Sequence, residues 1–226
     1  TQLGALTTEQ LSNMTTTQLD AMSSAKITAL SSAQVGALTT DQIAAMETQD
    51  VAALSSSAIK GLTTDQVAAL ETRDVAALKT SQVAALSAGG ISGLSTTQII
   101  ALGTAQVEAL TTTQVAALTT AQINVLTTDD IDGLTPGQAG ALTSAQIAAM
   151  STDNLASFST DQIAALSSRV FASLSSGQVT ALTTDQIVSL STYQVSNLST
   201  ATLRALTTDQ VVALTTGQVG SLTTAG

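Results

Sequence analysis

The chain has 226 residues, of which 44% are hydrophobic, 10% are charged and 1% are aromatic. An ordinary globular domain has about 25% charged residues, and with so few aromatic residues the core must be built from Leu, Val, Ile and Ala. The net charge of −10 argues against nucleic acid or an anionic membrane as a partner, because both bind cationic surfaces.

The composition also argues against an enzyme. The sequence contains no histidine and no cysteine, so the most common general base and the thiol nucleophile are both missing. Thr, Ser or Gln interrupts the apolar residues every few positions, and no run approaches the roughly 18 apolar residues of a membrane-spanning helix. We therefore expect a soluble, non-enzymatic protein with no catalytic residue, no cofactor and no segment inserted in a membrane.

From its first residues the chain repeats a unit of eight, here called the octad. The leucine row begins at Leu6, Met14 and Met22 and continues in steps of eight to Leu222. The valine row begins at Leu3 and Leu11 and continues to Val219. No insertion or deletion interrupts either row, so residues 1–226 are expected to form a single array of about 28 octads. Because no atypical capping octad is visible at either terminus, we expect the array to be a fragment of a longer one.

The octad period disfavours one continuous helix or strand. Eight residues of an α-helix advance by about 800°, so the leucine row would drift by about 80° per octad and could not form a buried stripe. A straight strand would place the leucine and valine rows on opposite faces, because their spacings of five and three are both odd. Each octad therefore needs a break.

The polar residues predict a helix start in every octad. In the octad at 206–213, Thr207 and Gln210 form a capping box. The Thr207 hydroxyl accepts a hydrogen bond from the Gln210 backbone amide, and the Gln210 side chain accepts one from the Thr207 backbone amide. Leu206 and Val211 are placed as a hydrophobic staple around this cap. Ser or Thr occupies 24 of the 28 cap-row positions from 7 to 223, and Gln occupies 19 of the 28 box-row positions from 2 to 218.

Proline and aspartate support the same register. Pro136 follows cap residue Thr135, at the first helical position, where its missing N–H costs nothing. Acidic residues recur at the second helical position, where they complement the helix dipole. The prediction is an all-α solenoid of short capped helices, each of roughly six to eight residues and stable only by packing on its neighbours. The aspartates at the second helical position are Asp41, Asp65, Asp129, Asp153, Asp161, Asp185 and Asp209.

Two further rows predict how the octads pack. The small row, directly before the leucine row, is nearly always Ala, Gly or Ser and should let backbones approach closely. The outer row, one residue earlier, varies freely and should face solvent (Asp20, Lys60, Ile100, Glu108, Asp132, Arg204). The acids at the second helical position group in steps of 24, which indicates either three octads per superhelical turn or duplication of 24-residue blocks.

The densest acidic cluster is a weak candidate for a metal site. Asp129, Asp130 and Asp132 could offer oxygen ligands to Ca²⁺. The cluster lacks the alternation and the distant Glu of an EF-hand, and the glycine-rich stretch 88–93 lacks the Asp of the nonapeptide calcium repeat. A solvated acidic surface is the simpler interpretation, so we predict no metal site.

Other side chains have structural interpretations. Glu-Thr-x-Asp replaces Thr-Thr-x-Gln at 47–50 and at 71–74, where ion binding is the alternative to a structural role. The regular threonines could form an ice-binding array, but the first threonine of each pair is already used as a cap. Phe158, Phe171 and Tyr193 are interpreted as local variation of the core or surface.

Octads such as Leu38-Thr39-Thr40-Asp41-Gln42-Ile43-Ala44-Ala45 resemble the tandem-repeat tracts of very large bacterial secreted or surface proteins of the adhesin-like and haemagglutinin-like kind. The resemblance implies an extracellular or cell-surface location, and a stalk, spacer or surface-display rod as the function. The alternative is a solenoid that binds a peptide, a glycan or an ion. The expected partners are other domains of the same protein, a surface ligand, or further copies through uncapped ends of the array.

Overall fold

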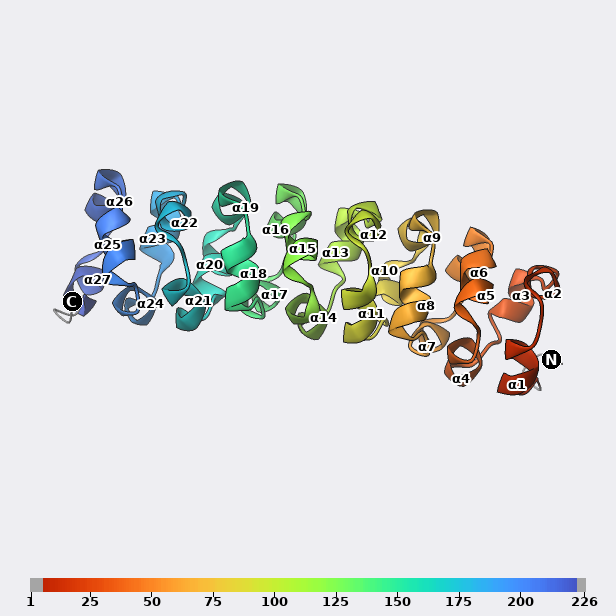
Figure 1. Cartoon of the computed structure of the whole chain (residues 1–226). Coiled ribbons are helices and arrows are strands. Elements are labelled where there is room, and N and C mark those ends of the chain that lie inside the picture. The colour runs from red at the N-terminus through yellow and green to blue at the C-terminus, as the bar shows by residue number, and fades with distance from the viewer. Residues whose placement is uncertain (1–5, 223–226) are drawn as a thin grey trace. The chain divides into compact units, whose positions relative to one another are not determined.

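The computed structural model describes residues 6–222, and all regular secondary structure in that range is helical (Figure 1). Leu3, and the terminal residues from which a fragment was predicted, lie outside the described residues. The chain divides into two compact units, Thr1–Leu118 (unit 1) and Thr119–Gly226 (unit 2).

Unit 1 contains the first fourteen helices of the described chain, one in each octad. They are α1 (Thr8–Ser12), α2 (Thr16–Asp20), α3 (Ser24–Ile27), α4 (Ser32–Gly36), α5 (Thr40–Ala45), α6 (Thr48–Ala53), α7 (Ser56–Ile59), α8 (Thr64–Ala69), α9 (Thr72–Ala77), α10 (Thr80–Val83), α11 (Ala88–Gly93), α12 (Thr96–Ala101), α13 (Thr104–Glu108) and α14 (Thr112–Ala117).

Unit 2 continues with one helix per octad. Its helices are α15 (Thr120–Asn124), α16 (Thr128–Asp132), α17 (Pro136–Gly140), α18 (Ser144–Ala149), α19 (Thr152–Ser157), α20 (Thr160–Ala165), α21 (Ser168–Ala172), α22 (Ser176–Thr180), α23 (Thr184–Ser189), α24 (Thr192–Ser196), α25 (Thr200–Ala205), α26 (Thr208–Ala213) and α27 (Thr216–Ser221).

The capping register predicted from the sequence is confirmed. At the start of α8, the Gln66 amide donates to Thr63 Oγ1 at 3.2 Å, and the Thr63 amide donates to Gln66 Oε1 at 2.8 Å. Pro136 occupies the first turn of α17, after cap residue Thr135. The same two hydrogen bonds recur in most octads, so local side-chain chemistry sets where each helix begins.

The helices have four to six residues each, so the longest reach the lower end of the predicted six to eight and the others are shorter. The linker limits their length, because each six-residue helix up to α26 is followed by two extended residues, the leucine-row residue and the next cap residue. Leu70 has φ −59° and ψ 138°, and the next cap residue, Glu71, has φ −71° and ψ 154°. Among the described residues no φ is positive, so the chain turns without the left-handed glycine that ends many helices.

Within each unit, three octads make one turn of the solenoid. Each helix contacts the helix three places further on in the chain, which is also three octads later in the sequence. Acids 24 residues apart therefore lie on stacked helices of one column. The contacts form three columns in unit 1 (α1–α4–α7–α10–α13, α2–α5–α8–α11–α14, α3–α6–α9–α12) and three in unit 2 (α15–α18–α21–α24–α27, α16–α19–α22–α25, α17–α20–α23–α26).

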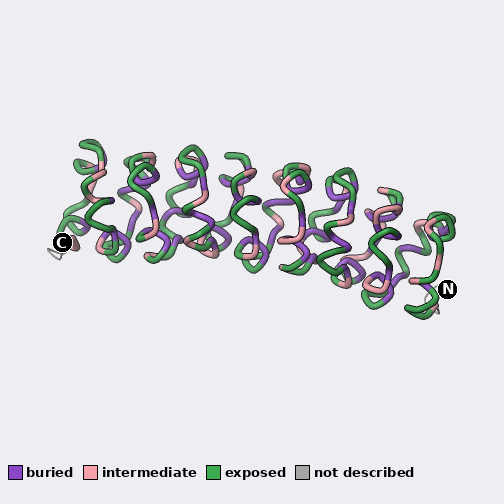
Figure 2. The backbone as a smooth tube through the Cα atoms, viewed as in Figure 1, coloured by how far each residue is buried: buried purple, intermediate pink, exposed green. Residues whose placement is uncertain are grey.

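The leucine and valine rows form the core. In α8 and its linker, Val67 is fully buried and Leu70 is 4% exposed, and this pattern repeats along both units. Figure 2 shows buried segments alternating with exposed ones along the backbone. Phe158 and Phe171 replace members of the two rows and are buried, whereas Tyr193 is exposed on α24. The core is thus a stack of thin apolar layers.

The small row is confirmed as the place where backbones approach closely. A Cβ atom added to Gly61 would lie 1.9 Å from the carbonyl oxygen of Ser32 in the preceding turn. A Cβ added to Gly93 would lie 2.6 Å from Thr64 Cγ2. The six outer-row residues named above are all exposed, as predicted.

Candidate functional site

The box-row glutamines, which the sequence predicts only as capping residues, are buried and connect successive turns. Gln114 is 2% exposed, and its Oε1 accepts the amide of cap residue Thr111 at 2.7 Å. Its Nε2 donates to the carbonyls of Val83 and Leu86, each at 2.8 Å, in the preceding turn. One side chain therefore caps its own helix and also binds the backbone of the turn before it.

We call this arrangement a glutamine rung. Each rung satisfies backbone carbonyls that would otherwise be buried without a second partner, and a typical hydrogen bond of this kind contributes about 1 kcal/mol. Among the described residues no buried side-chain nitrogen or oxygen lacks a partner. Rungs to a valine-row carbonyl and a leucine-row carbonyl of the preceding turn are made by Gln42, Gln66, Gln82, Gln106, Gln114, Gln162, Gln178, Gln186, Gln194, Gln210 and Gln218.

Three octads have aspartate in place of the box-row glutamine, and at two of them, Asp50 and Asp74, the direction of the inter-turn bond is reversed. Asp50 and Asp74 are 4% and 0% exposed. Asp50 Oδ1 accepts the hydroxyl of Ser24 at 2.6 Å, and Asp74 Oδ1 accepts the hydroxyl of Thr48 at 2.6 Å. We call these bonds aspartate rungs. They join α3 to α6 and α6 to α9, so the two Glu-Thr-x-Asp segments have a structural role.

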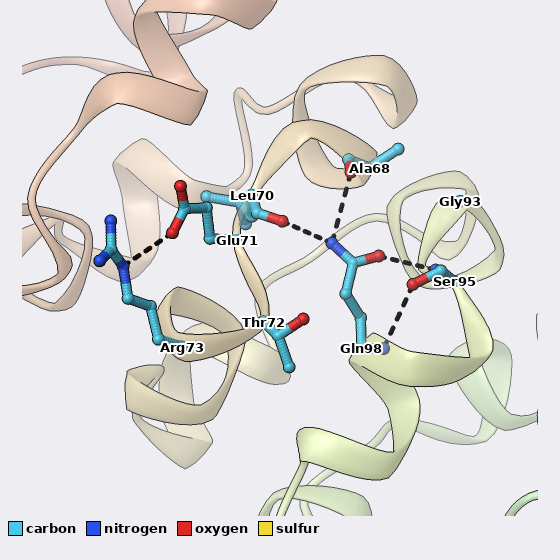
Figure 3. Close-up of a pocket in the computed structure, with 8 residues that line it drawn as sticks. All are labelled: Ala68, Leu70, Glu71, Thr72, Arg73, Gly93, Ser95 and Gln98. Atoms are coloured by element: carbon cyan, nitrogen blue, oxygen red, sulfur yellow. Dashed lines mark hydrogen bonds and ion pairs between the residues drawn. The ribbon is translucent and has the colours of Figure 1, made fainter.

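An open surface depression of about 570 Å³ lies beside α9 and the linker before α12. Figure 3 shows Gln98 directed from α12 toward the preceding turn, where Nε2 donates to Leu70 O at 2.7 Å and Ala68 O at 3.3 Å. Arg73 Nε lies 2.8 Å from Glu71 Oε2. Glu71 is thus paired with Arg73, and Ser95 Oγ accepts the Gln98 backbone amide at 3.2 Å. The lining residues are Ala68, Leu70, Glu71, Thr72, Arg73, Gly93, Ser95 and Gln98.

A second depression, of about 420 Å³, occupies the corresponding place in unit 2. It lies between the start of α18 and the start of α21, and its only charged lining residue is Arg169. Ser144 donates a long hydrogen bond, 3.4 Å, to the Arg169 carbonyl across it. Both depressions are gaps between successive linkers and do not gather reactive groups.

The three aspartates considered as weak metal candidates are not brought together. Asp130 is buried in the box row, where its Oδ2 accepts the amide of Thr127 at 2.9 Å and the hydroxyl of Thr127 at 2.8 Å. Asp129 and Asp132 are exposed on the outside of α16. Residues 6–222 contain no group of three or more Asp, Glu, His or Cys side chains placed to hold a metal ion.

The glycine-rich stretch forms an ordinary helix of the array. The Gly90 amide donates to Ser87 Oγ at 2.9 Å, and α11 stacks on α8. Within residues 6–222, no helix is both long and apolar enough to cross a membrane.

Comparison with sequence families identifies the repeat. The profile of a family described as the ALTTAQ repeat matches residues 13–46, 43–80, 67–104, 91–120, 115–144, 140–168, 164–192 and 192–224. The family pattern is read directly at Ala117-Leu118-Thr119-Thr120-Ala121-Gln122, which joins a small-row alanine to a cap and a box-row glutamine. A comparison with curated proteins finds no match.

Proposed function

The chain belongs to the ALTTAQ repeat family, and we propose that it acts as a structural spacer, a stalk or display rod within a larger protein, without catalytic activity. The observation that carries the proposal is the use of its polar residues. Cap hydroxyls accept hydrogen bonds from helix amides, as Thr111 does from the Gln114 amide. Box-row glutamines donate to carbonyls of the preceding turn, as Gln114 does to Val83. The hydroxyl and amide groups that recur in every such octad are thus engaged in capping and stacking.

A secreted or cell-surface location is part of the same proposal. It is supported by the cysteine-free, acidic composition rich in Thr, Ser and Ala, and by the resemblance of the octads to adhesin-like repeat tracts. Protease treatment of intact cells that express the parent protein tests this location. Digestion of the array on the intact cell supports it, and digestion only after lysis contradicts it.

The spacer proposal predicts that length follows the number of turns. Two spin labels can be placed in unit 1 at Thr17→Cys and Thr113→Cys, on exposed positions of α2 and α14, because the chain has no other cysteine. Deletion of residues 88–111 removes α11, α12 and α13 and keeps the octad register. The distance measured by double electron–electron resonance should shorten by about 8–10 Å, one interhelical spacing.

A distance distribution as broad as that of a flexible chain, or one unchanged by the deletion, would overturn the spacer proposal. The matched control removes no turn: Thr104→Ala changes one side chain of α13 and should leave the distance unchanged.

One observation favours a binding surface as the second candidate. Asp161, Asp185 and Asp209 lie on three successive helices of one column, α20, α23 and α26, which carry no basic residue. Val188 and Val212 are exposed on α23 and α26. Under this alternative the column would bind a cationic, partly apolar peptide. Changing the three aspartates to asparagine would then abolish binding of such a peptide and leave the helical circular dichroism spectrum unchanged.

A further inference from the structure

One octad of unit 2 has no polar side chain in the box row. Its box-row residue is Val170 of α21, which is 2% exposed and carries neither an oxygen nor a nitrogen in its side chain. The backbone groups that a glutamine would bind here are the amide of cap residue Ser167 and the carbonyl of Leu142 in the preceding turn. Neither group has a hydrogen-bond partner among residues 6–222. This octad therefore lacks a rung.

The equivalent octad of unit 1 shows which chemical group fits this pair. In Figure 3, Gln98 Oε1 accepts the amide of cap residue Ser95 at 2.7 Å, and Gln98 Nε2 donates to the carbonyl of Leu70 at 2.7 Å. Ser167 and Leu142 hold the same places in the repeat as Ser95 and Leu70, three turns later. A primary carboxamide matches the pair, because its oxygen accepts from the amide and its nitrogen donates to the carbonyl.

The two unpaired groups belong to residues that line the depression of about 420 Å³ between α18 and α21. Arg169 lies at the same depression, is exposed, and forms no ion pair among residues 6–222. The column that contains it, α15–α18–α21–α24–α27, has no acidic residue in its helices. The Arg169 guanidinium can therefore pair with a carboxylate of a ligand.

Arg169 distinguishes this octad from two others whose box-row residue is also not polar. These residues are Ala58 of α7 and Gly90 of α11. The residue before each of them is uncharged, Ser57 in one case and Gly89 in the other. The octad of α21 thus combines an unpaired amide and carbonyl with a cation beside them.

We propose that the depression at α21 binds the C-terminal glutamine of a peptide. Its side-chain carboxamide lies between the Ser167 amide and the Leu142 carbonyl, and its α-carboxylate pairs with Arg169. The ligand thus supplies from outside the chain the rung that Val170 cannot make. The inference does not depend on the proposed spacer function, because it concerns one octad and leaves the stacking of the others unchanged.

Titration of the full chain with N-acetylglutamine, followed by NMR of the backbone amides, tests the proposal. This probe carries the carboxamide and the carboxylate of a C-terminal glutamine, and it should shift the Ser167 amide resonance saturably. N-acetylglutamate replaces the amide donor with a second carboxylate. It should bind about tenfold more weakly, because it cannot donate to the Leu142 carbonyl. No saturable shift with N-acetylglutamine, or equal affinity for the two probes, would overturn the proposal.

A matched pair of variants separates the site from the fold. Val170→Gln restores the rung with the chain's own carboxamide, and should lower the affinity for N-acetylglutamine by at least about tenfold while raising the free energy of unfolding. Val170→Ala leaves the Ser167 amide and the Leu142 carbonyl unpaired and should still bind the probe. Circular dichroism confirms that both variants remain helical. Binding to Val170→Gln that equals binding to the wild type contradicts the assigned position of the carboxamide.

A second pair of measurements tests the role of Arg169. Arg169→Gln should weaken the binding of N-acetylglutamine several-fold, as expected for the loss of an exposed ion pair. The same substitution should leave the binding of N-acetylglutaminamide, which has no carboxylate, unchanged. Equal losses for the two probes would show that Arg169 does not pair with the carboxylate, and would refute that part of the proposal.

Discussion

Turns joined by glutamine rungs and turns joined by aspartate rungs have the same backbone stacking and opposite hydrogen-bond polarity. In the glutamine case, Gln114 donates to carbonyls of the turn before it. In the aspartate case, Asp74 accepts a hydroxyl from the turn before it. At these turns the box-row side chain therefore reaches the preceding turn, and the partner there can be an acceptor or a donor.

The two kinds of rung differ in what they demand from the preceding turn. Carbonyls are present at every position of the backbone, so a glutamine rung can form wherever the helices stack. An aspartate rung needs a hydroxyl on the first helical residue of the turn before it, because a buried carboxylate without donors is costly. Ser24 and Thr48 supply those hydroxyls to Asp50 and Asp74. Aspartate rungs are thus tied to the identity of a second residue, and the following substitutions test this difference.

The largest effect is expected where a glutamine rung receives a carboxylate. Gln114→Glu places an acceptor-only, buried charge against the carbonyls of Val83 and Leu86, and should destabilise its turn by about 3–5 kcal/mol. Urea denaturation followed by circular dichroism, fitted with nearest-neighbour terms between turns, measures the change. Gln10→Glu is the control, because Gln10 is exposed and has no preceding described turn, and it should change the stability little.

The next largest loss of stability is expected when the hydroxyl donor of an aspartate rung is removed. Thr48→Val deletes the hydroxyl that Asp74 accepts, and should cost about 2 kcal/mol because the carboxylate is fully buried. Thr40 lies at the same place relative to the glutamine rung of Gln66, on the first helical residue of the turn before it. Thr40→Val should therefore change the stability by less than about 0.5 kcal/mol. If Thr48→Val and Thr40→Val lowered the free energy of unfolding equally, the hydrogen bond from Thr48 to Asp74 would not stabilise the turn.

A smaller difference is expected at the caps. Thr111→Ala removes the oxygen that accepts the Gln114 amide at 3.2 Å and should cost about 1 kcal/mol. Glu71, the cap residue of the aspartate rung at Asp74, makes no side-chain cap bond and pairs instead with exposed Arg73. Glu71→Ala should cost roughly 0–1 kcal/mol and lose that cost in high salt. A salt-independent cost would contradict the assignment to the ion pair.

The smallest expected effect is a slight increase in stability, at the cap of α13. The Gly103 amide already donates to Gln106 Oε1 at 2.7 Å, but glycine offers no side chain to cap α13. The Gln106 amide donates to the Gly103 carbonyl at 2.8 Å, and Gly103→Ser should add a side-chain acceptor for the same amide and stabilise the turn by a few tenths of a kcal/mol. Hydrogen exchange of the Gln106 amide, which should slow, measures the change more sensitively than denaturation. Unchanged exchange would indicate that the serine hydroxyl does not adopt the cap position.

The local parts of this architecture could be predicted from the sequence, because their interactions lie within a single octad. Thr207, Gln210 and Pro136 define where helices begin. The grouping of acids in steps of 24 allows two interpretations, three octads per turn or duplication of 24-residue blocks, and the contacts between every third helix show three octads per turn. The sequence overestimates helix length because the leucine-row residue and the cap both adopt extended conformations, as at Leu70 and Glu71.

The rungs could not be predicted in the same way, because their partners lie a full turn of the solenoid earlier in the chain. A capping box accounts for the glutamine oxygen, and nothing within the octad indicates where the amide nitrogen donates. The available signal is the replacement of glutamine by Asp50 and Asp74, each with a hydroxyl residue, Ser24 or Thr48, at the start of the helix one turn earlier. The aspartate cluster at 129–132 misleads for a related reason, since Asp130 belongs to the buried box row and its neighbours do not.

With three octads per turn, the position of an octad in the sequence determines both its column and its layer within each unit. Adding one octad moves all later side chains to the next column, whereas adding three returns them to the same column one layer further along. Because every column is built from the same core rows and caps, both changes preserve the apolar packing, whereas an aspartate rung is kept only where a hydroxyl residue lies one turn earlier. The number of octads therefore determines both the column on which an epitope or attached domain lies and its distance along the solenoid axis.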